Sequence, residues 1–145
     1  VNKEGSGDMY YKGALLLNTI RHILNDDAKW WKLLLDYSET YKKQIIDTET
    51  VITFFNKETG KDLTPLFNQY LRYKNIPVLE LRTQNNRLEY RWKVNVENFQ
   101  MPVEYTYKGK TTRMNVTTEW QKFDKKITAD QLEFNTKKMY YNIQK

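Results

Sequence analysis

The sequence predicts an α+β fold, in which an array of four helices is followed by a small antiparallel β-sandwich. Three observations carry this prediction. Apolar residues recur with helical spacing from Asp8 to about residue 74, the spacing changes to strict alternation after Pro77, and short polar turns separate the segments throughout. We therefore expect a helical domain over residues 1–76 and a β-sandwich domain over residues 77–145.

The first helix is expected from Asp8, a candidate N-cap, to about residue 24. One face of it carries residues that lie three, four and seven positions apart, namely Tyr10, Gly13, Ala14 and Leu17. Further leucines and isoleucines make this helix apolar nearly all round, which is typical of a helix buried in a larger body. A chain of 145 residues can hardly cover such a helix on every side, so part of its covering is expected from elsewhere.

Two capped helices are expected next. Asp26 or Asp27 can begin the second helix, over about residues 28–43, because a carboxylate at the N-cap accepts a backbone N–H of the first turn. Asp47 can begin the third helix in the same way. Gly60 then ends the third helix, since glycine adopts the left-handed conformation at a helix C-terminus without strain.

The fourth helix is expected to begin near Pro65 and to end before Pro77, since proline is tolerated in a first helical turn and cannot continue a helix. The large apolar side chains at helical spacing in these three helices are interpreted as core. They are Trp30, Trp31, Leu34, Leu35, Tyr37, Tyr41, Val51, Ile52, Phe54, Phe55, Leu66, Phe67, Tyr70 and Leu71.

After Pro77 the alternation of apolar and polar residues is the pattern of strands with one buried face. Strands are expected over residues 79–83, 88–96, 103–107, 112–120 and 139–143, with shorter ones near Phe123, Ile127 and Leu132–Phe134. Residues 84–87 and 108–110 can form the hairpin turns. Six or seven short antiparallel strands with one wet face predict the sandwich.

The composition excludes several classes of site. The 24 basic and 18 acidic residues give a net charge of +6, but they are interleaved along the chain, so we interpret them as a solvated surface and expect no nucleic-acid partner. The chain has no cysteine and hence no disulfide or thiolate metal site. No apolar run approaches the roughly 20 residues that span a bilayer, no secretory signal is present, and no feature indicates a compartment.

His22 is the single histidine, and it lies on the first helix. A zinc peptidase needs two histidines and a carboxylate around its metal, so this chain cannot build that site by itself. We interpret His22 as structural and predict no metal ligand in the chain.

Two motifs resemble the M1 family of zinc metallopeptidases, the group of aminopeptidase N and leukotriene A4 hydrolase. The first is Tyr10-x-Lys12-Gly13-Ala14, followed by Leu-Leu-Leu-Asn-Thr-Ile-Arg. The second is Gly60-x-Asp62-Leu63 followed by Leu66-Phe67-Asn68-Gln69-Tyr70-Leu71, which is similar to a helix of the family in which the aromatic residue is usually Trp. Ile76-Pro77-Val78-Leu79 resembles the entry into the β-sandwich, so the likeness covers residues 8–80.

The resemblance implies that residues 1–76 are the C-terminal part of a thermolysin-like peptidase domain, with the β-sandwich as the next domain. It assigns Tyr10 the catalytic role of donating a hydrogen bond to the oxyanion that forms during peptide hydrolysis. The family's His-Glu-x-x-His helix, its further Glu ligand and its Gly-x-Met-Glu-Asn loop do not occur here and would lie upstream of Val1. Zinc and the peptide substrate would therefore be bound by the parent protein, and the chain alone is expected to be inactive.

Alternatives remain open at this point. Tyr10 can merely pack, with its hydroxyl bonded to a backbone carbonyl, while Tyr11 is expected in the core and Lys12 is expected in solvent or paired with an acid. The parent can also be a non-catalytic M1-like scaffold or protein-interaction module. A third interpretation is an anion-binding module.

Overall fold

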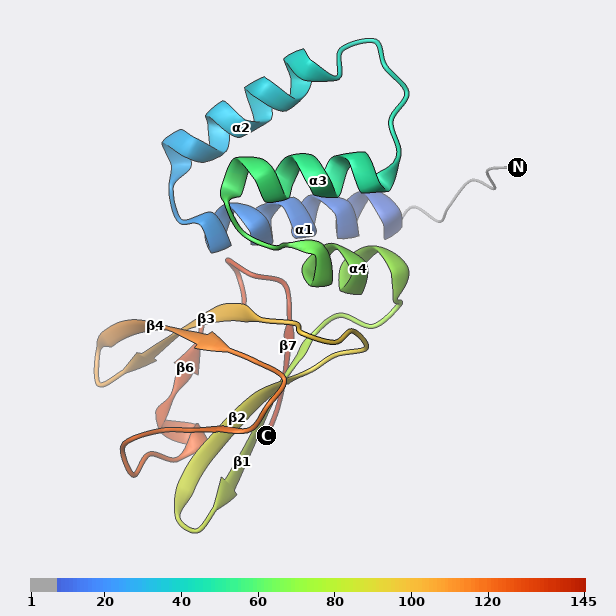
Figure 1. The fold of residues 1–145 in the computed structure, drawn as a ribbon. Helices are drawn as coiled ribbons and strands as arrows, with labels where there is room; N and C mark the ends of the chain where they lie inside the picture. The colour runs from blue at the N-terminus through green and yellow to red at the C-terminus, as the bar shows by residue number, and fades with distance from the viewer. Residues whose placement is uncertain (1–7) are drawn as a thin grey trace.

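The structure, a computed structural model, describes residues 8–145, with side chains from Tyr10 onward. Over that range the chain forms four α-helices, seven β-strands and one 3₁₀ helix. Figure 1 shows the helices gathered at one end of the molecule and the strands at the other. The predicted α+β fold, with an N-terminal helical array and then a β-sandwich, is confirmed.

The helices are α1 (Asp8–Leu24), α2 (Asp27–Thr40), α3 (Thr48–Thr59) and α4 (Thr64–Arg72). The caps of α2 and α3 are those that the sequence predicts, whereas Asp8, the predicted cap of the first helix, begins α1 and its side chain lies outside the described residues. The Asp26 carboxylate accepts from the backbone N–H of Lys29 at 3.0 Å, the Asp47 carboxylate accepts from that of Thr50 at 2.8 Å, and Gly60 adopts φ 68° after α3. Helix α2 ends at Thr40 rather than near residue 43, because the chain turns there and Lys43 takes a positive φ.

The strands are β1 (Val78–Gln84), β2 (Arg87–Lys93), β3 (Met101–Tyr107), β4 (Lys110–Val116), β5 (Gln121–Lys122), β6 (Glu133–Phe134) and β7 (Asn142–Gln144). The 3₁₀ helix η1 (Ala129–Gln131) lies between β5 and β6. One sheet has the order β5-β2-β1-β7, and the other has the order β4-β3-β6. Strand β4 ends at Val116, four residues before the predicted end at residue 120. The backbone N–H of Thr117 donates instead to the side-chain oxygen of Gln121 at 2.9 Å.

The last strand differs from its prediction in position and direction. Strand β7 begins at Asn142 rather than near residue 139, and it runs parallel to β1, whereas the other strand pairs of residues 8–145 are antiparallel. The preceding segment passes beneath the helices, where the backbone N–H of Tyr140 donates to Thr19 Oγ1 at 3.0 Å. The chain therefore enters the sheet from the same end as β1 does.

Helices α1 and α4 join the helical array to the sandwich. Asn18 donates to the backbone oxygen of Lys138 at 3.1 Å, and Arg113 Nη2 donates to the carbonyls of His22 at 2.6 Å and Ile23 at 3.0 Å. One apolar cluster runs from the helices into the sandwich. The predicted boundary at Pro77 coincides with the change from helix to strand, and the division into two domains there stays a prediction.

Four aromatic or leucine side chains that were predicted as core are exposed instead. Tyr11 is 74% exposed, Trp31 is 56% exposed and Leu35 is 58% exposed, and Leu71 is also open. Each lies on the outer side of a helix that buries its other side, and no other helix or strand of the described residues covers it. Within residues 8–145, none of the helices has the length and apolarity to cross a bilayer.

Candidate active-site helix

Tyr10, the predicted catalytic residue, lies in the first turn of α1. Its side chain is 70% exposed, and its hydroxyl makes no hydrogen bond to another of the described residues. The alternative in which Tyr10 packs with its hydroxyl on a backbone carbonyl therefore does not describe this structure. The phenol stands at the N-terminal end of a helix, where the helix dipole favours negative charge nearby.

Lys12 ties this turn of α1 to a distant part of the chain. Its Nζ donates to the backbone carbonyl of Tyr73 at 2.5 Å and lies 3.4 Å from that of Lys74. Both carbonyls belong to the connection between α4 and β1, so Lys12 ties the start of α1 to the point where the helices end. Lys12 was expected in solvent or beside an acid. Its partners, 61 and 62 residues away, could not be found from local spacing.

Gly13 and Ala14 leave the helix surface next to Tyr10 open. A Cβ built on Gly13 would meet no atom within 4 Å among the described residues, and Ala14 is exposed. Glycine inside a helix is less stable than alanine by roughly 0.5–1 kcal/mol. No described residue packs so closely on Gly13 that a larger side chain would be excluded, so the described contacts do not explain the glycine. A second backbone packed against Gly13 would explain it.

An exposed apolar stripe continues from Tyr10 along α1 and onto α2. Ala14 and Leu17 follow Tyr10 on the same face, and Trp31 and Leu35 share an exposed face of α2. We call these five residues the α1–α2 surface. Arg21 connects its two parts, because its guanidinium lies 5.2 Å from the centre of the Trp31 ring and 2.8 Å from the Asp27 carboxylate.

His22 lies near the end of α1 and is half-buried. Burial, followed by the charges of Lys138 and Arg21, lowers the pKa of its imidazole, which favours the neutral form at neutral pH. From residue 8 onward, no three side chains of the types His, Cys, Asp and Glu are grouped so that they could hold a metal ion.

The arrangement places a hydrogen-bond donor on an open surface. A phenol hydroxyl can donate a hydrogen bond to an oxygen.

The comparisons with known proteins add no relative. A scan against models of protein families finds no match for this chain, and a search of curated proteins finds no similar sequence.

Proposed function

We propose that the chain is the C-terminal portion of a zinc-dependent M1-type peptidase, an aminopeptidase, and that it supplies Tyr10 and a supporting β-sandwich. The observation that carries the proposal is the exposed Tyr10 phenol on a helix end that Lys12 anchors. The resemblance of Tyr10-x-Lys12-Gly13 to the family motif supplies the reaction class.

Tyr10 acts on the transition state of peptide hydrolysis. The attack of water on the peptide carbonyl gives a tetrahedral oxyanion, and a donor aimed at that oxygen binds it more strongly than it binds the substrate. Removal of one such donor typically raises the barrier by about 3 kcal/mol. Lys12 and the core hold the helix that carries Tyr10, which fixes the backbone position of this donor.

The described residues do not fit a zinc site, since they hold no suitable group of side chains. We therefore assign no metal-dependent step to them. In the parent enzyme the metal ligands are expected in the upstream segment of the same polypeptide, as the resemblance implies.

The α1–α2 surface is where that upstream segment is expected to pack. It is apolar and exposed, and exposed apolar patches of this kind mark interaction sites. Gly13 and Ala14 allow a second backbone to approach Tyr10 closely, because neither carries a side chain longer than a methyl group.

A non-catalytic M1-like scaffold is the second candidate function. The same exposed surface favours it, since a partner can bind there without any reaction at Tyr10. The sequence of the parent upstream of Val1 distinguishes the two, because a peptidase needs an intact His-Glu-x-x-His helix and a scaffold does not.

The test is the substitution Tyr10→Phe in the full-length parent, assayed on aminoacyl substrates. We expect kcat to fall by about 10²–10³ with little change in KM, because the lost hydrogen bond is made in the transition state. The matched control is Tyr11→Phe, since Tyr11 is adjacent and equally exposed but faces another direction. A kcat that stays within twofold for Tyr10→Phe would contradict the catalytic role, and a parent without any peptidase activity would favour the scaffold.

A further inference from the structure

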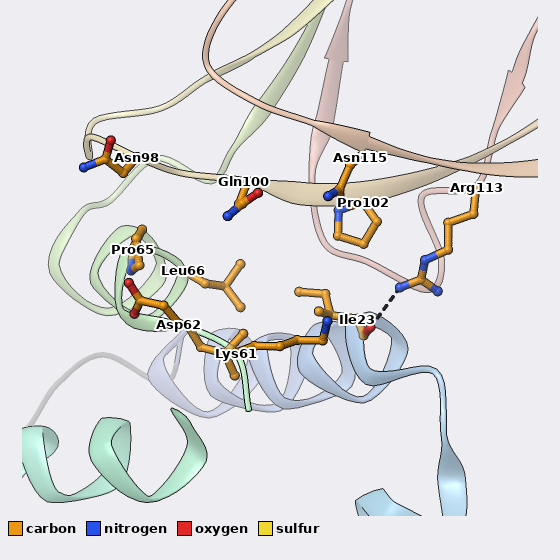
Figure 2. Close-up of a pocket in the computed structure, with 11 residues that line it drawn as sticks. Ile23, Lys61, Asp62, Pro65, Leu66, Asn98, Gln100, Pro102, Arg113 and Asn115 are labelled. Carbon is orange, nitrogen blue, oxygen red and sulfur yellow. Dashed lines mark hydrogen bonds between the residues drawn. The ribbon is translucent and has the colours of Figure 1, made fainter. Parts of the chain in front are cut away.

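A cavity of about 380 Å³ lies at the junction between the helices and the sandwich. Figure 2 shows its two walls. The connection from α3 to α4 and the start of α4 form one wall, and the beginning of β3 and the end of β4 form the other. Tyr10 does not line this cavity, so a ligand bound in the cavity is independent of the function proposed for Tyr10.

The sandwich wall carries carboxamide side chains because of the strand register. Gln100 precedes β3, and Asn115 in β4 pairs with Pro102 in β3, so Gln100, Pro102 and Asn115 share the outer face of this sheet. Asn98 adds a third carboxamide from the loop after β2. Figure 2 shows Gln100 and Asn115 pointing toward the cavity.

Arg113 closes one end of the cavity and ties the sandwich wall to α1, while its buried Nη1 has no hydrogen-bond partner among the described residues. Its Nη2 binds the carbonyls of His22 and Ile23, and its buried Nη1 lies 3.7 Å from the Glu104 carboxylate. Arg113 therefore holds the junction together through its Nη2, which is committed to the two α1 carbonyls.

The remaining polar groups of the cavity are available. The side chains of Lys61, Asn98, Gln100 and Asn115 make no hydrogen bond or ion pair with the rest of residues 8–145. Asp62 uses one carboxylate oxygen to accept from the backbone N–H of Thr64 at 3.0 Å, which leaves its second oxygen. In Figure 2 the Lys61 ammonium lies toward the Arg113 end of the cavity, and the Asp62 carboxylate lies at the other end.

We propose that this cavity binds a short extended peptide segment that carries a carboxylate. A carboxamide offers one donor group and one acceptor, as a peptide group does, so the three carboxamides can pair with the N–H and C=O groups of a bound backbone. Lys61 can pair with the carboxylate, and Asp62 can accept an N–H group at the opposite end, which sets the direction of the peptide. Leu66 and Pro65 form an apolar floor for its side chains.

The cavity suits other ligand classes less well. Nucleic-acid bases stack on aromatic side chains, and none of the residues that line this cavity is aromatic. A phosphate group favours several cationic or N–H donors, whereas Lys61 is the one lining cation whose side chain binds no other described residue, since Arg113 is held by the carbonyls of α1. The volume of the cavity lies at the small end of the range of ligand sites, which fits a peptide segment of a few residues.

The test is calorimetric titration of the full chain with three probe peptides. The probes are N-acetyl-Ala-Ala-Ala with a free carboxyl terminus, its carboxamide, and the carboxamide of N-acetyl-Ala-Glu-Ala. We expect millimolar Kd values for the carboxylate-bearing probes and binding about tenfold weaker for the neutral one. The tighter of the two charged probes shows whether the terminal or the side-chain carboxylate is the preferred source.

Three variants assign the binding to this cavity. Lys61→Met should weaken the charged probes about tenfold, to the level of the neutral probe, because both then lack an ion pair. Gln100→Leu should weaken all three probes. Lys42→Met is the control, because Lys42 is an exposed lysine after α2 and the change in net charge is the same.

Both test positions are exposed, so the fold should survive, and the far-ultraviolet circular dichroism of each variant checks this. The proposal is overturned if no probe binds to the wild-type chain. It is also overturned if Lys61→Met and Gln100→Leu both bind the probes as the wild type does, or if Lys42→Met weakens binding as much as Lys61→Met.

Discussion

Tyr70 connects α4 to the segment before β7. Its hydroxyl donates to the backbone carbonyl of Tyr140 and lies 3.9 Å from the sulfur of Met101, and burial raises the pKa of this phenol well above its ordinary value. The hydroxyl therefore stays protonated and remains a donor throughout the physiological range. This single hydrogen bond satisfies a carbonyl at the junction of the helices and the sandwich.

We expect Tyr70→Phe to lower the free energy of unfolding by about 1–2 kcal/mol, because the Tyr140 carbonyl is left without its partner. Urea unfolding measures this. Tyr73→Phe is the control, because Tyr73 is exposed and uses its backbone carbonyl, not its hydroxyl, to bind Lys12. Equal stability of Tyr70→Phe and the wild type would show that water or another donor replaces the hydroxyl.

Gly13 and Gly60 are expected to respond in opposite ways to the same substitution. Gly13→Ala should stabilise the chain by roughly 0.5–1 kcal/mol, because Gly13 is helical and its added methyl group meets no described atom within 4 Å. Gly60→Ala should destabilise the chain by about 1 kcal/mol, because Gly60 has φ 68° at the end of α3.

Thermal unfolding of the two variants of the isolated chain checks both signs. In the parent, Gly13→Ala should instead weaken peptidase activity if another backbone approaches that position, as proposed above. Destabilisation of the isolated chain by Gly13→Ala would mean that a neighbour already occupies this space.

Two ion-pair clusters and one tryptophan cover the outer face of the β1–β2 hairpin. The clusters are centred on the carboxylates of Glu80 and Glu89. Arg82 and Lys122 lie 2.8 and 3.4 Å from the Glu89 carboxylate. The guanidinium groups of Arg82 and Arg91 lie 3.8 and 4.5 Å from the centre of the Trp120 ring. Although Glu89 is on the face predicted to be wet, these side chains leave it only 2% exposed.

Glu89 gives this hairpin a pH dependence. The hydrogen bond from Arg82, followed by that from Lys122, holds the pKa of Glu89 below its ordinary value in the folded state. A carboxyl group with a lowered folded pKa stabilises the protein above its unfolded pKa of about 4.3, and this contribution is lost as the pH falls through the folded pKa. The wild-type free energy of unfolding should therefore decline on acidification below about pH 5.

We expect Glu89→Gln to be less stable than the wild type at pH 7 and to show a shallower decline, so that the two curves approach each other at acidic pH. Urea unfolding across the pH range measures this. Glu97→Gln is the control, because Glu97 is exposed and makes no ion pair with the described residues, and its curve should run parallel to that of the wild type. A parallel curve for Glu89→Gln would contradict the assignment.

At the scale of the whole molecule, the α1–α2 surface is expected to control whether the isolated chain self-associates. Its apolar side chains are uncovered by residues 8–145, and such a surface tends to bury itself against another copy when its natural covering is missing. We expect the isolated chain to self-associate. Its weight-average sedimentation coefficient, measured by sedimentation velocity, should rise with protein concentration.

The double substitution Leu17→Gln and Leu35→Gln should reduce this association. Ile45→Gln is the control, because Ile45 is fully exposed in the connection between α2 and α3 and does not belong to the α1–α2 surface. A chain that stays monomeric at all concentrations, or a double variant that associates as the wild type does, would contradict this role of the surface.

The fold could be predicted closely where neighbouring residues decide the structure. The caps Asp26 and Asp47 and the stop at Gly60 act within one helical turn, and the alternation that begins after Pro77 is a property of consecutive residues. The direction of β7 could not be predicted in this way, because its pairing with β1 joins residues more than sixty positions apart.

The candidate site was predicted in part for the same reason. The motif selects Tyr10 and not Tyr11, but its spacing does not show that both are exposed or that Lys12 binds the carbonyl of Tyr73. Periodicity identifies an apolar helix face and cannot show whether another element covers it, which is why Trp31 and Leu35 were wrongly expected in the core.

The sequence by itself determined that four helices precede the strands, where α2 and α3 begin, the stop at Gly60 and the residue for which a catalytic role is proposed, because these depend on local spacing and side-chain chemistry. The tertiary structure alone decided which apolar faces remain open, how Lys12 and Tyr70 join distant segments, and where the cavity beside Lys61 lies. Those features depend on contacts between residues far apart in the chain, which no local pattern specifies.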